Sequence, residues 1–261
     1  MSALETLWAG LSVATHSLTD RGSKTPRFLR RNAQPIVLLH GFAASSLALL
    51  PLADHLTRTL GRPVLRLRLS DRLALNLGDI RHSAARASKA VEQLAQVPGF
   101  RYADVVGHSL GGLVATYWLK RLDRERRIRR VITLGTPHRG APLALAGALV
   151  FGAFSRAIWQ MLPGSPFLRE LEALPVPEGA ELISVCAEAD LVVPRTSAYL
   201  APEPRHRNEM LAELDHLGFL HHARCHTFVE SALATANRVR AAARRKLRAP
   251  APKRRSRESY A

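Results

Sequence analysis

The chain has 261 residues, of which 47% are hydrophobic and 23% charged, and its formal net charge at pH 7 is +17. This size and composition are typical of one globular domain with a sizeable core, and they exclude a fibrous or fully disordered chain. Two cysteines are present, Cys186 and Cys225, and their number and spacing do not indicate a disulfide framework.

Short apolar runs alternate with helix-prone stretches along the chain. This alternation predicts an α/β fold with a mostly parallel sheet of about six strands and helices on both faces. The expected strands are residues 36–40, 63–69, 103–107, 131–135, 181–187 and 208–214. The expected helices are residues 2–18, 45–60, 79–96, 110–122 and 219–246. The first residues lack the basic segment of a secretory signal, so we expect a cytoplasmic protein or one at the inner face of a membrane.

The first apolar run follows Pro35 and ends in His40-Gly41-Phe42. Four consecutive branched apolar residues predict a strand that is buried on both faces. For the His40 side chain we expect a buried structural role, in which it shapes the loop, rather than direct proton transfer.

A Gly-x-Ser-x-Gly pattern stands at residues 107–111, after an apolar run and before an apolar, helix-prone segment. A strand, a sharp turn and a helix in this order form a nucleophile elbow, which exposes a serine hydroxyl. Gly107 and Gly111 lack side chains, so strand and helix can approach closely while Ser109 takes a strained conformation. The pattern predicts a serine hydrolase with Ser109 as the nucleophile. An ordinary turn rich in glycine and serine is the alternative.

A third motif, Gly-Thr-Pro-His-Arg-Gly at residues 135–140, follows another apolar run. By its residues alone it is a turn whose proline cannot continue the strand. Together with His-Gly-Phe and Gly-His-Ser-Leu-Gly-Gly, it resembles in order and spacing the motifs of bacterial lipases and related esterases of the α/β-hydrolase superfamily. The resemblance covers roughly residues 34–230.

This resemblance implies an α/β-hydrolase fold and an oxyanion hole formed by the backbone N–H groups of Phe42 and Leu110. We expect substrate to lie against residues of the three motifs, namely His40, Gly41, His108, Thr136 and Pro137. No cofactor is expected. The family orders its catalytic residues as serine, acid and histidine, so an acid and then a histidine are expected downstream.

The acid is sought after the apolar run at residues 181–187. The segment that follows resembles the family's acid loop, in which Asp is followed by an apolar pair and Pro. We therefore assign Asp190 as the acid, which would accept a hydrogen bond from the histidine ring and stabilise the imidazolium. Glu188 and Asp215 are the competing carboxylates, and each could instead be a solvated loop charge.

The histidine belongs to a short segment that contains four histidines. His216 is the predicted base, because the segment at residues 215–220 resembles the family's motif of histidine, leucine, glycine and an apolar pair. A neutral imidazole can take the proton from the serine and return it to the leaving group. Asp215 stands where glycine is frequent in the family, which could alter the turn or the pKa of the histidine.

The same segment could instead form a metal site, because ligands four residues apart share a helix face. The candidate ligands are His221, His222, Cys225 and His226. No second cluster of Cys or His completes such a site, so we predict no metal.

An apolar insertion is expected at about residues 141–178, since residues 141–154 contain no charged side chain. As a cap, it would cover the serine and present an apolar wall to an acyl chain. A plain core helix is the alternative. A membrane span needs about 20 apolar residues, and the uncharged stretch at 140–155 is shorter.

About half of the net positive charge lies in residues 238–261. Residues 238–261 hold ten Lys or Arg and one Glu, which gives +9 and leaves +8 for residues 1–237. We expect a hydrolase domain over 1–237 and a basic, partly disordered tail over 238–261. The tail could contact anionic lipid headgroups, or nucleic acid, or nothing specific. Because no nucleic-acid module accompanies it, no specific nucleic acid is expected.

The residues and the resemblance together predict a serine carboxylic ester hydrolase with lipase-like substrates, which acts through an acyl-enzyme on Ser109. The alternatives are an acyltransferase or amidase on the same scaffold, and a non-catalytic binding protein.

Overall fold

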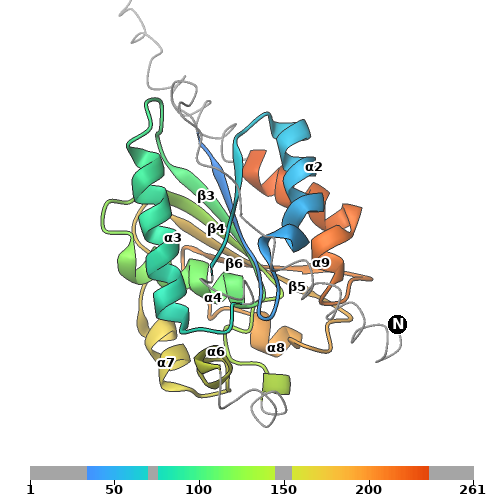
Figure 1. Ribbon diagram of the computed structural model, residues 1–261. Helices are drawn as coiled ribbons and strands as arrows, with labels where there is room; N and C mark the ends of the chain where they lie inside the picture. The colour runs from blue at the N-terminus through green and yellow to red at the C-terminus, as the bar shows by residue number, and fades with distance from the viewer. Residues whose placement is uncertain (1–33, 70–75, 145–154, 235–261) are drawn as a thin grey trace, which may run out of the picture.

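The computed structural model describes residues 34–69, 76–144 and 155–234 (Figure 1). Four predicted features lie wholly or partly outside these ranges. They are the helix near residues 2–18, the apolar middle of the cap insertion, the end of the helix expected at 219–246 and the basic tail at 238–261.

Six parallel strands form one sheet in the order β2-β1-β3-β4-β5-β6, which confirms the predicted fold class. Their bounds are β1 Ile36–Leu39, β2 Val64–Leu67, β3 Ala103–His108, β4 Ile128–Leu134, β5 Glu181–Ala187 and β6 His206–Leu211. The chain order reverses between β1 and β3. In open parallel sheets, ligands bind outside the carboxyl ends of the strands at such a reversal, and this is where the loops with His40 and Ser109 begin.

The central strands are apolar on both faces, and each face packs against its own set of helices. Alternate residues of β1 show the division: Ile36 and Leu38 belong to one buried cluster, whereas Val37 and Leu39 belong to the other. The first cluster packs against α2 and the last helices, and the second against α3, α4, α6 and α7 (Figure 1). Because helices cover both faces of the sheet, the sequences of the central strands are continuous apolar runs.

Helices α2, α3 and α4 begin and end close to the predicted residues, whereas α6, α7 and α8 are not among the expected helices. The bounds of the helices are α2 Leu50–Leu60, α3 Ile80–Ala95, α4 Leu110–Tyr117, α6 Arg156–Gln160, α7 Pro166–Ala173, α8 Arg195–Ala198 and α9 Gly218–His221. A 3₁₀ turn at Ser46–Leu49 precedes α2, and a π turn at Trp118–Leu122 follows α4. Side-chain caps begin several of the helices: Asp79 accepts a hydrogen bond from the backbone of α3, Ser155 from that of α6, and Ser165 from that of α7.

Two predicted elements are wrong at their ends. The helix expected at 219–246 is interrupted at His222, whose backbone is extended and whose Nδ1 accepts a hydrogen bond from the Arg224 amide. A new helix therefore begins at residue 223 and continues through residue 234. The last strand, expected at 208–214, ends at Leu211, because Glu213 has a positive φ of 60° and turns the chain away from the sheet.

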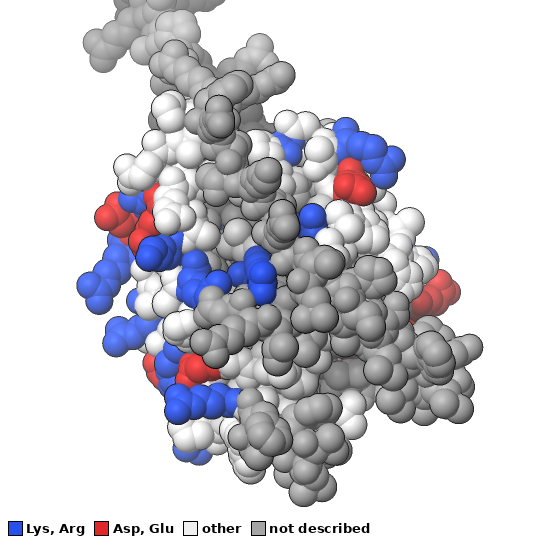
Figure 2. Space-filling view, in the orientation of Figure 1, with Lys and Arg blue, Asp and Glu red and all other residues white. Residues whose placement is uncertain are grey.

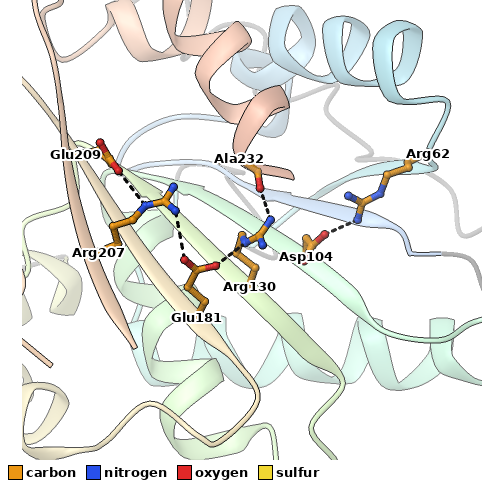
Figure 3. A network of polar contacts seen from close by, with 7 residues as sticks. All are labelled: Arg62, Asp104, Arg130, Glu181, Arg207, Glu209 and Ala232. Carbon is orange, nitrogen blue, oxygen red and sulfur yellow. Dashed lines mark hydrogen bonds and ion pairs between the residues drawn. The ribbon is translucent and has the colours of Figure 1, made fainter. Parts of the chain in front are cut away.

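A network of ion pairs and hydrogen bonds joins β4, β5 and β6 to the last helix (Figure 3). Arg130 is 8% exposed and donates from Nε to Glu181 over 3.0 Å, and from Nη1 to the Ala232 carbonyl. Arg207 bridges Glu181 and Glu209 at 3.5 and 2.9 Å. Arg130 is the member that ties the sheet to the helix at 223–234.

We expect Arg130→Met to lower the free energy of unfolding by about 2–3 kcal/mol, because it leaves the Ala232 carbonyl and one side of Glu181 without a donor. The matched control is Arg207→Met. Its side chain is 45% exposed, so its loss should cost less than about 1 kcal/mol. Urea unfolding of both variants checks this, and equal losses would contradict the role of Arg130.

Candidate active site

Ser109 stands at the turn between β3 and α4 and has a positive φ of 53°. A non-glycine residue rarely takes this conformation, which costs about 1–3 kcal/mol. The turn is possible because strand and helix almost touch. A Cβ on Gly111 would lie 2.3 Å from the Leu39 carbonyl oxygen, and one on Gly107 would lie 2.5 Å from the Gly111 carbonyl oxygen.

The ring of His216 is bonded to Asp190, with 2.8 Å between Nδ1 and Oδ2. Asp190 is 5% exposed, and its other oxygen accepts hydrogen bonds from the amides of Val192 and Val193 at 2.9 and 2.7 Å. Because a carboxylate only accepts, the proton of a neutral His216 ring lies on Nδ1. The lone pair is then on Nε2, where it can accept a proton.

The competing carboxylates lie elsewhere. Glu188 is exposed. Asp215 is also exposed, and its Oδ1 accepts a hydrogen bond of 2.6 Å from the Gly218 amide, the first residue of α9. Within the described ranges, Asp190 is the carboxylate bonded to the His216 ring.

The loop after β1 lies against the serine. A Cβ on Gly41 would be 3.2 Å from the Cβ of Ser109. In the part of the chain that the structure describes, the amides of Phe42 and Leu110 donate no hydrogen bond, and no hydrogen bond reaches the Ser109 hydroxyl from His216 or any other residue. In unliganded sites such hydrogen bonds are often long and tighten in the complex with substrate.

His40 is 1% exposed and is held inside this loop. Its Nε2 accepts from the Leu69 amide at 3.4 Å, so Nδ1 carries the proton that points to the Gly41 carbonyl at 3.2 Å. Asn76 holds the same loop, since its Nδ2 donates to the His40 carbonyl over 3.3 Å while its Oδ1 accepts from Ser83. Asn76 is not among the residues predicted from the sequence, because its positive φ of 48° and its contact with this loop cannot be inferred from the sequence.

Thr136 of the third motif contacts the backbone of the elbow. Its hydroxyl donates to the Ser109 carbonyl over 3.0 Å. Pro137 is buried in the turn that follows, and its carbonyl accepts from the Gly140 amide at 3.0 Å. The Thr136 contact explains why this motif lies beside the serine.

His108, expected to touch substrate, lies with its ring beside His216. The ring centroids are 4.8 Å apart, and His108 Nε2 is 3.0 Å from the His216 carbonyl oxygen. Burial, reinforced by the nearby His216, lowers the pKa of His108 to about 3. His108 is therefore neutral at physiological pH.

The histidine and cysteine cluster does not converge. Cys225 is fully buried, and burial raises the pKa of its thiol to about 12, so the thiol is protonated at physiological pH. His226 Nε2 is bonded to the Leu220 carbonyl at 3.1 Å. Among the described residues, no group of three or more His, Cys, Asp or Glu could hold a metal ion.

Two sequence comparisons find proteins that are similar to this chain. A family model described as "PGAP1-like alpha/beta domain" matches residues 86–162, which include Ser109 and Thr136. A triacylglycerol lipase of Vibrio cholerae is 28% identical over 155 residues, which is 58% of this chain and 46% of that lipase. The chain therefore spans less than half the length of this relative.

Solved lipases share the fold. The mature lipase BlEst2 of Bacillus licheniformis aligns with a TM-score of 0.60 at 19% identity, over 75% of this chain and 91% of that one. A monoacylglycerol lipase of Paleococcus ferrophilus aligns with a TM-score of 0.59 at 15% identity, over 79% and 96%. The fold of this chain is therefore the α/β-hydrolase fold that these lipases have. Among the described residues, no helix has the length and apolar character that a membrane span requires.

We expect Gly111→Ala to lower the free energy of unfolding by about 1–3 kcal/mol, because the added methyl group would overlap the Leu39 carbonyl. Alanine favours a helix by about 1 kcal/mol over glycine, so any loss of stability must come from the overlap. Gly78→Ala is the control, since a Cβ there has no atom within 4 Å. Thermal unfolding of both variants measures the loss of stability. A Gly111→Ala variant as stable as the wild type would contradict the close approach of β1 and α4.

Proposed function

We propose that this protein is a serine carboxylic ester hydrolase that acts on acyl esters through an acyl-enzyme on Ser109. The observation that carries the proposal is the 2.8 Å hydrogen bond between His216 and a buried Asp190, at the end of the sheet where Ser109 forms its strained turn. The three residues follow the family order of serine, acid and histidine.

In the first step, His216 Nε2 accepts the hydroxyl proton while Ser109 Oγ attacks the carbonyl carbon of the ester. The negative oxygen of the tetrahedral intermediate would be bound by the amides of Phe42 and Leu110, which have no other acceptor among the described residues. Each such donor is worth about 3–4 kcal/mol. Leu110 also begins α4, so the helix dipole favours negative charge at this point.

The intermediate then collapses. The imidazolium of His216 gives its proton to the departing alkoxide, which leaves as an alcohol, and the acyl group remains on Ser109. A water molecule, deprotonated by His216, attacks the acyl carbon and releases the carboxylic acid. Asp190 stabilises the imidazolium in both halves of the reaction and holds its Nδ1 proton in place.

An apolar substrate is favoured by the residues that follow β4 and β5. Leu143, Trp159 and Leu191 are 56%, 53% and 92% exposed, although each is large and apolar. Leu191 directly follows Asp190, and Trp159 lies on α6 within the cap insertion. Their exposure supports the acyl chain of an ester or lipid as substrate, as does the likeness to a triacylglycerol lipase.

Initial rates on 4-nitrophenyl esters of increasing acyl length test the proposal. We expect wild-type hydrolysis, a rate lowered by at least about 10³-fold in Ser109→Ala, and a maximum whose chain length separates an esterase from a lipase. A folded wild type without activity on any ester would contradict hydrolysis and favour an acyltransferase, an amidase or a non-catalytic protein.

We further propose that the basic tail at 238–261 contacts anionic membrane, a proposal that rests on the sequence because the tail lies outside the described residues. The described domain is itself basic over α3, where Lys and Arg side chains gather (Figure 2). A truncated chain must therefore be compared with the full one.

Removal of residues 238–261 should weaken binding to phosphatidylserine vesicles, since each basic residue near the surface contributes roughly 1 kcal/mol. Binding to phosphatidylcholine vesicles serves as the control and should not change. Equal sedimentation of the full and truncated chains with anionic vesicles would contradict the proposal and leave the tail solvated.

A further inference from the structure

His108 connects the strand of the nucleophile to the loop of the base. It is the last residue of β3 and directly precedes Ser109. Its Nε2 lies 3.0 Å from the carbonyl oxygen of His216. Because a carbonyl oxygen only accepts, the proton of the neutral ring lies on Nε2 and is donated to His216.

The His108 ring has little freedom to move. The residue is 4% exposed, and a Cβ on Gly41 would lie 3.2 Å from its Nδ1. The ring centroid of the fully buried Phe219 is 6.3 Å away, and that of His216 is 4.8 Å away at an angle of 47°. The ring is therefore enclosed by the loop after β1, by α9 and by the residue that it holds.

His216 lies in a turn after β6, outside any helix or strand. Its ring is fixed by Asp190 from the loop after β5, and its carbonyl is fixed by His108 from β3. These two hydrogen bonds act on different parts of the residue. The first sets the tautomer of the ring, and the second sets the distance of the turn from the strand that carries Ser109.

The donor persists during the reaction. His108 stays neutral in the physiological range, because burial lowers its pKa to about 3, so it does not compete with His216 for the proton of Ser109. A charged ring at this place would repel the imidazolium of His216. A neutral N–H donor avoids that repulsion and still holds the turn.

We propose that His108 is a positioning residue for His216: its Nε2–H binds the main-chain carbonyl of His216 and keeps the base within reach of Ser109. This rests on the proposed function insofar as His216 is the base. Misplacement of a catalytic group by about 1 Å can cost about 100-fold in rate, so the loss of one anchor should appear in kcat.

Three substitutions separate the donor from the bulk of the ring. Gln places its amide N–H₂ where Nε2 stands, Asn places it near Nδ1, and Leu offers no donor. We expect His108→Gln to keep kcat within about 3-fold of wild type, and His108→Asn and His108→Leu to lower kcat by roughly 10–100-fold with KM within about 2-fold. Thermal unfolding shows whether each variant is folded. If His108→Leu does not fold, the comparison of His108→Gln with His108→Asn still tests whether the Nε2 donor is needed.

A second readout does not depend on activity. In ¹H NMR spectra, the strongly deshielded proton between His216 Nδ1 and Asp190 should remain sharp in His108→Gln and should broaden by faster exchange in His108→Asn. Absent ester hydrolysis in wild type would overturn the proposed function, whereas this resonance would still report the anchor. The positioning role is overturned if Asn and Leu retain wild-type kcat and an unchanged resonance, or if Gln loses as much as Leu.

Discussion

All six strands run parallel, so every segment that follows a strand leaves the sheet at the same end. This constraint gathers residues that are far apart in the chain. The loops after β1, β3, β4, β5 and β6 supply Gly41, Ser109, Thr136, Asp190 and His216. Helices on both faces bury the strands, and the sheet thereby provides a rigid base for the loops.

Contacts with neighbouring residues hold the strained backbone conformation at Ser109. Gly111 lies against the Leu39 carbonyl, and Thr136 donates to the carbonyl of Ser109 itself. Strain of about 1–3 kcal/mol at one residue is small beside the burial of the strands on either side. The same contacts fix the Leu110 amide at the start of α4, so the geometry of the Ser109 turn and that of the proposed anion site are one feature of the fold.

Much of this arrangement could be predicted from the sequence, because it is encoded locally. Continuous apolar runs gave the strands, and Gly-x-Ser-x-Gly after such a run gave the turn. The bond between Asp190 and His216 joins two residues that only the resemblance to the lipase family implies, one through its acid loop after residue 187 and the other through its histidine motif at 215–220.

Other features depend on contacts that no local pattern encodes. The helix break at His222 arises from a histidine that caps the next helix, a role for which histidine has no strong preference. The end of β6 depends on a positive φ at Glu213. Asn76 and His108 donate hydrogen bonds to the main-chain carbonyls of His40 and His216. Every residue has a main-chain carbonyl, so the sequence does not indicate which carbonyl each side chain binds.

The central claim is that Ser109 is an activated nucleophile, and labelling with a fluorophosphonate tests it most directly. In the reaction Ser109 Oγ would form a bond to phosphorus, fluoride would leave, and His216 would accept the hydroxyl proton. Peptide mass spectrometry of the folded protein should place the label on Ser109, and heat-unfolded protein should carry none there. A folded protein that stays unlabelled at Ser109, or that is labelled at another serine, would contradict the account.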